Sequence, residues 1–360
     1  MRLLGFHQIL VGAAPGDAIT SMALALRTAL RALGPSEIYA LHRAPEMLGE
    51  VFPLEHLPEL GRDGVIVYHS SYGEPAMTQF LLAREERLVV AYHNVTPASF
   101  YLQHAPAFAA GLEWGRREVE LLRSRAVAAV ADSHFNADEL AGMGYTDVRV
   151  VPAGLRPGRL TQVIPDGLLG AQLRAEQPGG FVLSVSQVLP HKRFELLIEA
   201  MHLVQWVHER PLGLVVVGNQ RMPEYAEALH GLAVQLNVRN VRFTGAISDR
   251  GLSAYYRSAE VFATTSAHEG LAVPPLEAMS FGLPVVATGC GALGETIAGA
   301  GLVLPPSAGP ELISEAIVAI HDDARLRHDL SVRGFERVAE VEAHDPSDAF
   351  LALMCEVVGR

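Results

Sequence analysis

Two acidic residues and a basic pair stand where predicted loops meet predicted helices. Glu269 and Glu277 are eight residues apart, and Lys192 is followed directly by Arg193. A cation at the start of a helix is disfavoured by the helix dipole, whereas a bound anion would account for its presence. We therefore interpret Lys192 and Arg193 as candidate anion-binding residues, with solvated surface charges as the alternative.

The segment around Glu269 predicts a strand, a loop, a short helix and a second strand. The run 259–265 and the run 284–287 are apolar, and Pro274 and Pro275 suit the first turn of a helix over 276–281 that stops at Gly282. In open α/β sheets, ligands bind at the carboxyl ends of parallel strands. Glu269 is therefore expected at such an end, with the N–H groups that follow it facing an anion.

The pattern around these two glutamates resembles a known family signature. Glu269-x7-Glu277 stands with Gly270, Pro275, Ala278 and the run Gly282-Leu283-Pro284-Val285. This resembles the retaining nucleotide-sugar glycosyltransferases of the GT-B fold, the large group called glycosyltransferase family 4. The resemblance implies transfer of a hexosyl group from a nucleotide diphosphate sugar to an acceptor hydroxyl, with retention at the anomeric carbon.

The same resemblance implies roles for residues of the second half. The run 185–193 is similar to the family stretch G-R-L-x-P-x-K-G, so Lys192 falls on the lysine that contacts the diphosphate. The family's arginine position is the uncharged Gln187, for which Arg193 would compensate only in part. Glu269 would lie near the hydroxyls of the donor sugar, and Glu277 would reach the ribose. Backbone N–H groups near the phosphates would come from Gly270, Leu271, Ala272 and Val273, and the base would contact the loops that hold Gly218, Thr244, Gly245 and Ala246.

The first half would supply the acceptor side and further donor contacts. His93, at the end of a predicted strand, matches a family histidine that contacts the donor sugar, and His69 ends the preceding strand in the same way. The small-residue loop with Gly16 resembles one that packs against the donor phosphates. Lower-ranked acceptor-side candidates are Asp17, Thr96 and Glu113. Asp132-Ser133-His134 could suggest a hydrolase, but no G-x-S-x-G is present, and Ser133 is interpreted as a helix cap.

Length and composition bound these hypotheses. The chain has 360 residues, a formal charge of −12 and two cysteines. This length favours two domains. The negative charge argues against a general nucleic-acid binder, and two cysteines suit a reducing compartment. Without a long apolar run or a secretory signal, the expected location is the cytoplasm, with the inner face of the membrane left open.

Strand-like runs alternate with helical patterns in both halves, which predicts parallel sheets. The expected fold is α/β and of the GT-B type, with two doubly wound Rossmann-like domains facing across a cleft. Residues 1–155 would form the acceptor-side domain, beginning with a strand at 1–10 and a loop at 11–17. The Gly- and Pro-rich stretch 156–178 is predicted as a linker. Residues 179–345 would bind the nucleotide sugar, with a broken helix at 323–342, and 346–360 would form a helix that returns to the first domain.

No metal or cofactor is expected. H-E-x-x-H, a cysteine cluster and D-x-D are all missing from the sequence. Lys192 and helix N-termini would then stabilise the leaving diphosphate, and the acceptor's proton would pass to the leaving phosphate oxygen. Three alternatives stay open: a glucan phosphorylase or synthase, a sugar-nucleotide 2-epimerase of the same fold, and a non-catalytic dinucleotide-binding module.

The expected partners are a nucleotide sugar donor and a carbohydrate or glycolipid acceptor. The run 90–97 resembles bacterial transferases that build surface polysaccharides, so GDP-mannose is favoured mildly over UDP-sugars. A lipid-linked acceptor would require docking at a membrane surface, for which 97–102 offers aromatic side chains. The sequence does not indicate an oligomeric state.

Overall fold

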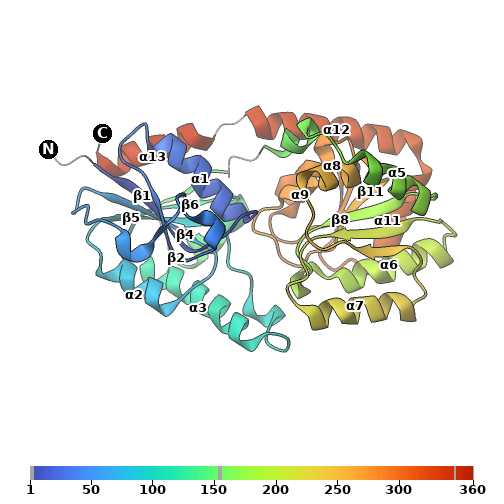
Figure 1. Ribbon diagram of the computed structural model, residues 1–360, viewed down its shortest axis with the longest axis horizontal. Coiled ribbons are helices and arrows are strands. Elements are labelled where there is room, and N and C mark those ends of the chain that lie inside the picture. Colours follow the sequence, from blue (N-terminus) through green and yellow to red (C-terminus); the bar gives the residue numbers. More distant parts are fainter. Residues whose placement is uncertain (1–3, 153–155, 344–345, 360) are drawn as a thin grey trace. The chain divides into compact units, whose positions relative to one another are not determined.

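The computed structural model describes residues 4–152, 156–343 and 346–359, and the chain folds into two compact units. Met1–Gly154 and Asp345–Arg360 form the first unit, and Leu155–His344 form the second. Each unit is a parallel sheet with helices on both faces (Figure 1). The expectation of two doubly wound α/β domains is therefore confirmed at the level of each domain's fold.

The first unit contains a seven-stranded parallel sheet in the order β3-β2-β1-β4-β5-β6-β7. Its inner strands are nearly continuous apolar runs, because helices cover both faces of a parallel sheet. The order reverses between β1 and β4, which are neighbours although two strands separate them in the chain. The strands are β1 (Phe6–Ala13), β2 (Ile38–Arg43), β3 (Phe52–Pro53), β4 (Val65–Ser70), β5 (Arg87–Tyr92), β6 (Ala126–Ala131) and β7 (Val148–Val150).

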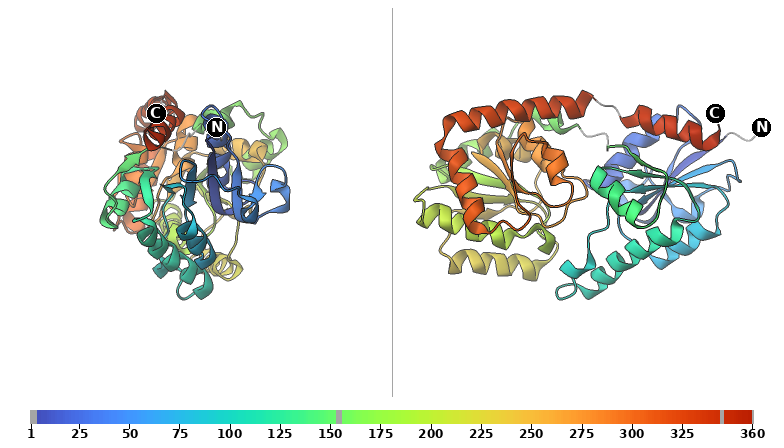
Figure 2. Two further views of the ribbon diagram at one scale, coloured as in Figure 1. Left: turned by 90° about the vertical axis from the view of Figure 1, so that its left-hand side faces the viewer. Right: turned by 180° about the vertical axis from the view of Figure 1, so that it is seen from behind.

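Two apolar clusters lie on the two faces of this sheet. One holds Leu30 of α1 and Leu353 of α13, and the other holds Leu81 of α2 and Leu122 of α3. Figures 1 and 2 show α1 and α13 on one face and α2 and α3 on the other. The helices are α1 (Ala18–Leu30), α2 (Pro75–Ala83), α3 (Pro106–Leu122), α4 (His134–Gly142) and α13 (Pro346–Val358), with 3-10 turns η1 (Pro45–Met47), η2 (Leu54–His56) and η3 (Ala98–Phe100).

The second unit contains a six-stranded parallel sheet in the order β10-β9-β8-β11-β12-β13. Its order reverses between β8 and β11, which pair through Val182 with Val261 and Leu183 with Phe262. The strands are β8 (Phe181–Val185), β9 (Gly213–Val217), β10 (Val241–Phe243), β11 (Val261–Thr264), β12 (Val285–Thr288) and β13 (Leu302–Leu304).

Apolar clusters again fill both sides of the second sheet. One packs Leu197 of α6 and Ile317 of α11 on the strands, and the other packs Tyr256 of α8 and Met279 of α9. The helices are α5 (Gly167–Glu176), α6 (Phe194–Trp206), α7 (Pro223–Gln235), α8 (Asp249–Ser258), α9 (Val273–Ser280), α10 (Leu293–Ile297), α11 (Pro310–Asp322) and α12 (Ala324–Ala343), with 3-10 turns η4 (Pro157–Gln162) and η5 (Pro190–Lys192).

The stretch 156–178 does not form the linker that its glycines and prolines predict. It folds as η4 and α5 within the second unit, and Leu160 and Leu173 are each 1% exposed in that unit's core. Glycine and proline mark helix starts here, because Pro157 begins η4 and Gly167 begins α5. Asp166 caps α5 by accepting hydrogen bonds from the N–H groups of Leu168 and Leu169.

Four further elements differ from the sequence-based expectation. β1 continues to Ala13, so its last residues occupy what was predicted as a loop beginning at residue 11. α12 is one continuous helix rather than a broken one. Gly334 does not interrupt it but lets it approach α9, because a Cβ there would lie 3.2 Å from Met279 Cβ. α2 and α10 were not predicted.

None of the helices in the part of the chain that the structure describes has the length and apolar character needed to cross a membrane.

Candidate functional site

The carboxyl edge of the second sheet brings Lys192 and Glu269 together. Lys192 lies in η5, which follows β8, and Glu269 lies in the loop that follows β11. These two strands are neighbours at the point where the strand order reverses. In doubly wound folds, this reversal opens a crevice outside the carboxyl ends of the strands, where ligands bind.

Backbone contacts fix the two loops to one another. The Thr265 hydroxyl donates to the carbonyl oxygens of Lys192 and Arg193 at 3.1 and 2.9 Å. The N–H of Ala267 donates to the carbonyl oxygen of His191 at 2.8 Å. Arg193 itself adopts the left-handed conformation, with φ 52° and ψ 47°, which ends η5 and starts α6. The side chain of Lys192 therefore leaves a well-anchored turn.

An ion pair joins the two predicted catalytic side chains of this unit. Lys192 Nζ lies 2.6 Å from Glu269 Oε1, and each side chain is 14% exposed. The backbone of Glu269 is held from the next loop, because its carbonyl oxygen accepts from the N–H of Ala292 at 2.8 Å. Gly291 makes this close approach feasible, since a Cβ at that position would lie 2.2 Å from the Glu269 oxygen.

His191 lies directly before the lysine and was not singled out from the sequence. It is 7% exposed. Burial, followed by the charges of Lys192 and His268, lowers the pKa of His191 to about 2. The ring is therefore neutral across the physiological range, and it adds no positive charge beside Lys192.

Glu277 occupies the middle of α9 and points toward a tyrosine. The hydroxyl of Tyr256 donates to Glu277 Oε2 at 2.9 Å, and Tyr256 is fully buried. Burial raises the pKa of Glu277, while the hydrogen bond from Tyr256 acts in the opposite direction. α9 begins at Val273, three residues earlier than expected, with the two prolines in its first turn as predicted.

The loops after β8, β9 and β10 are joined by short backbone contacts. The N–H of Val188 donates to the carbonyl of Asn219 at 2.9 Å, and the N–H of Gly218 donates to the carbonyl of Gly245 at 3.1 Å. Gly218 has a φ of 152°, and a Cβ there would lie 1.9 Å from the carbonyl oxygen of Ser186. Only glycine fits this approach, so the three loops form one connected edge.

The other predicted donor residues of the second unit lie along this edge. Thr244 donates through its hydroxyl to the Gly245 carbonyl at 2.9 Å. Gln187 and Ala246 are exposed, whereas Arg193 is half-buried. The predicted backbone donors follow Glu269 directly: Gly270, Leu271 and Ala272 lie in the loop, and Val273 is the first residue of α9.

The first unit carries the remaining predicted residues. Gly16 is exposed between β1 and α1 with a φ of 73°. Asp17 caps α1 by accepting from the N–H and the hydroxyl of Thr20, both at 2.8 Å. Thr96 is half-buried after β5, and Glu113 is exposed on α3. The role of Asp17 as a helix cap therefore accounts for an aspartate at this position.

The two strand-end histidines contact one another. His69 Nδ1 lies 2.7 Å from His93 Nε2, and His93 Nδ1 lies 2.7 Å from Asp132 Oδ2. Asp132 directly follows β6, just as His93 directly follows β5, and His69 is the second-last residue of β4. This shared position near strand ends is the signal that could have identified Asp132. Ser133 caps α4, accepting from the N–H of Asn136 as predicted.

Among the residues that the structure describes, no group of three or more His, Cys, Asp and Glu side chains is arranged to hold a metal ion.

Residues 171–337 match the family model described as glycosyl transferases group 1. The chain is 30% identical over 181 residues to the serotype-specific mannosyltransferase WbdA of Escherichia coli, which covers 48% of this chain and 22% of that protein. It is 26% identical over 194 residues to a GDP-mannose-dependent monoacylated alpha-(1-6)-phosphatidylinositol monomannoside mannosyltransferase of Corynebacterium glutamicum, covering 51% of this chain and 49% of that protein. The chain thus spans about a fifth to a half of the length of these curated relatives.

Among solved structures, the sucrose-phosphate synthase of Thermosynechococcus elongatus superposes with a TM-score of 0.72 at 19% identity, covering 99% of both chains. That likeness extends over both units. The chain therefore has the two Rossmann-like units of the GT-B glycosyltransferases, and its segment 171–337 is a match to the glycosyl transferases group 1 family.

Proposed function

We propose that the protein is a retaining glycosyltransferase that moves a hexosyl group from a nucleotide diphosphate sugar to an acceptor hydroxyl. The observation that carries the proposal is the Lys192–Glu269 ion pair, which lies at the strand-order reversal of the unit that matches the family model. A cation and a carboxylate side by side suit a ligand with a diphosphate and sugar hydroxyls.

Lys192 would stabilise the leaving group. The bond between the anomeric carbon and the diphosphate oxygen breaks, and a bond to the acceptor oxygen forms on the same face. The acceptor's proton passes to the leaving phosphate oxygen, so no protein base is required. Since Lys192 is only 14% exposed, its charge is less screened by water than that of a surface lysine and acts more strongly on the departing phosphate.

Glu269 would have two tasks. Its Oε1 holds Lys192 in place, and its second oxygen is offered to the hydroxyls of the donor sugar. Glu277, hydrogen-bonded to Tyr256, would receive the ribose. Arg193 would supply the charge that Gln187 lacks; its left-handed backbone aims its side chain differently from a residue inside α6.

GDP-mannose is the donor that we favour over UDP-sugars. The support is that both curated relatives carry mannosyltransferase names, one of them GDP-mannose-dependent. We further propose a carbohydrate or glycolipid acceptor of the kind found in surface polysaccharides, a cytoplasmic location, and activity without a metal ion.

Donor screening with product analysis tests this proposal. The purified chain is heated with GDP-mannose, UDP-glucose and other nucleotide sugars, because a ligand that binds the folded state raises its melting temperature. GDP-mannose is expected to give the largest rise, and Lys192→Met to abolish it. Incubation with an acceptor panel should then yield an α-linked product. An inverted product contradicts the retaining mechanism, and release of an epimerised donor without acceptor supports the epimerase instead.

A further inference from the structure

Four neighbouring strands of the first sheet each contribute one side chain to a continuous chain of hydrogen bonds. Gln8 lies in β1, His69 in β4, and His93 and Asp132 directly follow β5 and β6. Gln8 Oε1 lies 2.8 Å from His69 Nε2, and the two following contacts are 2.7 Å each. The imidazole planes are 6° apart and the ring centroids 5.0 Å apart, which with the 2.7 Å nitrogen–nitrogen contact means that the two rings meet edge to edge.

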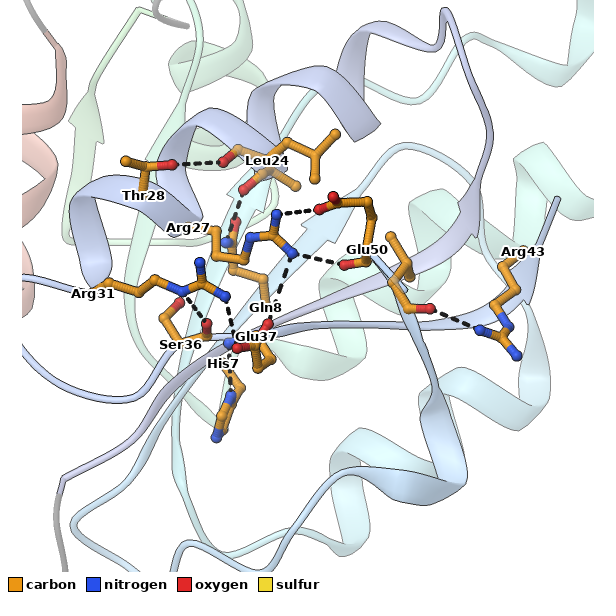
Figure 3. Close-up of polar contacts among 12 residues, drawn as sticks. His7, Gln8, Leu24, Arg27, Thr28, Arg31, Ser36, Glu37, Arg43 and Glu50 are labelled. Atoms are coloured by element: carbon orange, nitrogen blue, oxygen red, sulfur yellow. Dashed lines mark hydrogen bonds and ion pairs between the residues drawn. The ribbon is translucent and has the colours of Figure 1, made fainter. Parts of the chain in front are cut away.

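The amide of Gln8 sets the direction of this chain. Its Nε2 donates to the carbonyl oxygen of Ala23 in α1 at 2.9 Å, and Figure 3 shows Gln8 below that helix. A carbonyl can only accept, so the NH₂ group of Gln8 must face α1 and its oxygen must face His69. Since that oxygen also can only accept, His69 must carry a proton on Nε2.

The proton on Nε2 leaves Nδ1 of His69 as the atom that faces His93. His69 is 3% exposed, and burial, followed by the charge of His93, lowers its pKa well below the usual value, so the ring is neutral. A neutral ring protonated on Nε2 has a lone pair on Nδ1. His93 must therefore donate to it from Nε2.

Asp132, at the other end of this chain of hydrogen bonds, adds a second requirement on the protonation of His93. Nδ1 of His93 faces the Asp132 carboxylate at 2.7 Å, and the carboxylate can only accept. His93 thus needs a proton on both ring nitrogens. If His93 were neutral, either two lone pairs would oppose one another across 2.7 Å, or Gln8 would have to turn away from Ala23.

We propose that Gln8, His69 and Asp132 are positioning residues that hold His93 as an imidazolium ion at the carboxyl edge of the first sheet. A doubly protonated ring has no lone pair, so His93 does not serve as a general base and accepts no hydrogen bond from a substrate hydroxyl. It acts through a fixed positive charge beside the strand ends. The role in catalysis rests on the proposed glycosyl transfer, whereas the protonation state does not.

Other charged groups near this edge compensate one another. Glu139 of α4 pairs with Arg116 of α3 at 2.9 Å, and Glu139 also accepts from the hydroxyl of Tyr92 and the amide of Asn94. Asp17 at the start of α1 is engaged as a helix cap. The charge opposed directly to His93 is that of Asp132, and its ring neighbour is the neutral His69.

Nitrogen-15 NMR of the full chain with labelled histidine measures the protonation directly. The chain has 15 histidines, and the signals of His93 are identified by their loss in His93→Gln. At pH 7, both ring nitrogens of His93 are expected at protonated shifts, and His69 is expected to be protonated on Nε2 alone. An unprotonated nitrogen in His93, or a Nδ1 proton on His69, overturns the proposal.

Gln8→Met tests whether the Gln8 amide decides which ring nitrogens of His69 and His93 carry protons, with Gln177→Met as its matched control. Gln177 is another buried glutamine whose Nε2 donates to a backbone carbonyl, that of Asn240 at 3.3 Å. In Gln8→Met, the His69 proton is expected to move to Nδ1 and His93 to lose its Nε2 proton, whereas the control leaves the histidine signals unchanged. A His93 that stays doubly protonated in Gln8→Met contradicts the role of Gln8.

Asp132→Asn provides a second variant if Gln8→Met does not fold. Without the carboxylate charge, His93 is expected to become neutral at pH 7, and an unchanged spectrum overturns the proposal. In transfer assays, both variants should lower kcat while donor binding, measured by thermal shift, is kept. If neither the unaltered protein nor the variants show transfer, the proposed function fails, but the NMR result still decides the protonation state of His93.

Discussion

Lys192 Nζ lies 2.6 Å from Glu269 Oε1, and the two residues are 77 positions apart in the chain. Each side chain is only 14% exposed, so the two opposite charges are largely removed from solvent and compensate one another. Removing one partner leaves the other as a poorly hydrated charge that must find a new contact. The pair is therefore sensitive to substitution even before a ligand binds.

Glu269→Ala should cripple transfer. The variant loses both the contact that holds Lys192 and the carboxylate offered to the sugar, so kcat/KM is expected to fall about 100-fold or more, as for other preorganised electrostatic groups. Steady-state rates with GDP-mannose and an acceptor measure this. Because the two residues act as a unit, Lys192→Met and the double variant should lose about the same amount. Near-normal turnover in Glu269→Ala would remove this residue from the site.

Gly291→Ala should disturb the site through the backbone of Glu269. Its φ is 59°, and the new Cβ would lie 2.2 Å from the Glu269 carbonyl oxygen, so the loop must move. Gly299→Ala is the matched control, because its φ is 80° but no atom lies within 4 Å of the new Cβ. Both variants carry the left-handed strain of about 1 kcal/mol. Only Gly291→Ala should also lower activity; equal activities would contradict the close-packing argument.

Transfer activity is expected to survive chelation. In the proposed mechanism, Lys192 and backbone N–H groups stabilise the leaving diphosphate, so no divalent cation is needed. Assays of a chain dialysed against EDTA should match those with added Mg²⁺ or Mn²⁺. Complete loss of activity in EDTA, with recovery on adding a divalent ion, would overturn metal independence and leave the rest of the donor site to be reconsidered.

Glu118 should make the stability of the first unit depend on pH. The carboxyl is fully buried among Tyr68 and Thr78, and burial raises its pKa from 4.5 to about 6 despite hydrogen bonds from both. The folded state thus binds this proton more tightly than the unfolded chain. The resulting stabilisation is present below pH 4.5 and is lost as pH rises through 6, by about 2 kcal/mol.

Urea unfolding of Glu118→Gln and the unaltered chain at pH 4.5 and pH 7 measures this difference. The free energy of unfolding of the unaltered chain, taken relative to the variant, should be lower at pH 7 than at pH 4.5. Other titrating groups are common to both proteins and cancel in the comparison. A difference that does not change with pH would show that Glu118 titrates normally.

The sequence predicted the sheet-forming segments well because buried parallel strands are nearly continuous apolar runs. The apolar run 259–265 contains β11 (Val261–Thr264), and the run 284–287 overlaps β12 (Val285–Thr288), as predicted. The stretch 156–178 was misread because glycine and proline mark helix ends as well as linkers. Here the buried Leu160 and Leu173, not the small residues, decide where the segment packs.

The side-chain contacts of the site were predicted less completely than the positions of its residues. Lys192 and Glu269 were identified from local motifs, whereas their ion pair depends on β8 and β11 being neighbours in the sheet, which the sequence analysis did not predict. Gln8 and Asp132 carry no local motif. Their contacts with His69 and His93 span 61 and 39 residues of sequence, and they arise only when β1, β4, β5 and β6 lie side by side in the sheet.

The discontinuous first unit has a consequence for synthesis on the ribosome. Phe350, Leu353 and Met354 of α13 are among the most buried residues of the first unit, yet every residue of the second unit is made before them. The second sheet can therefore mature while the first still exposes the apolar groove that α13 fills. During that interval the nascent first unit is the part of the chain that a chaperone would need to shield.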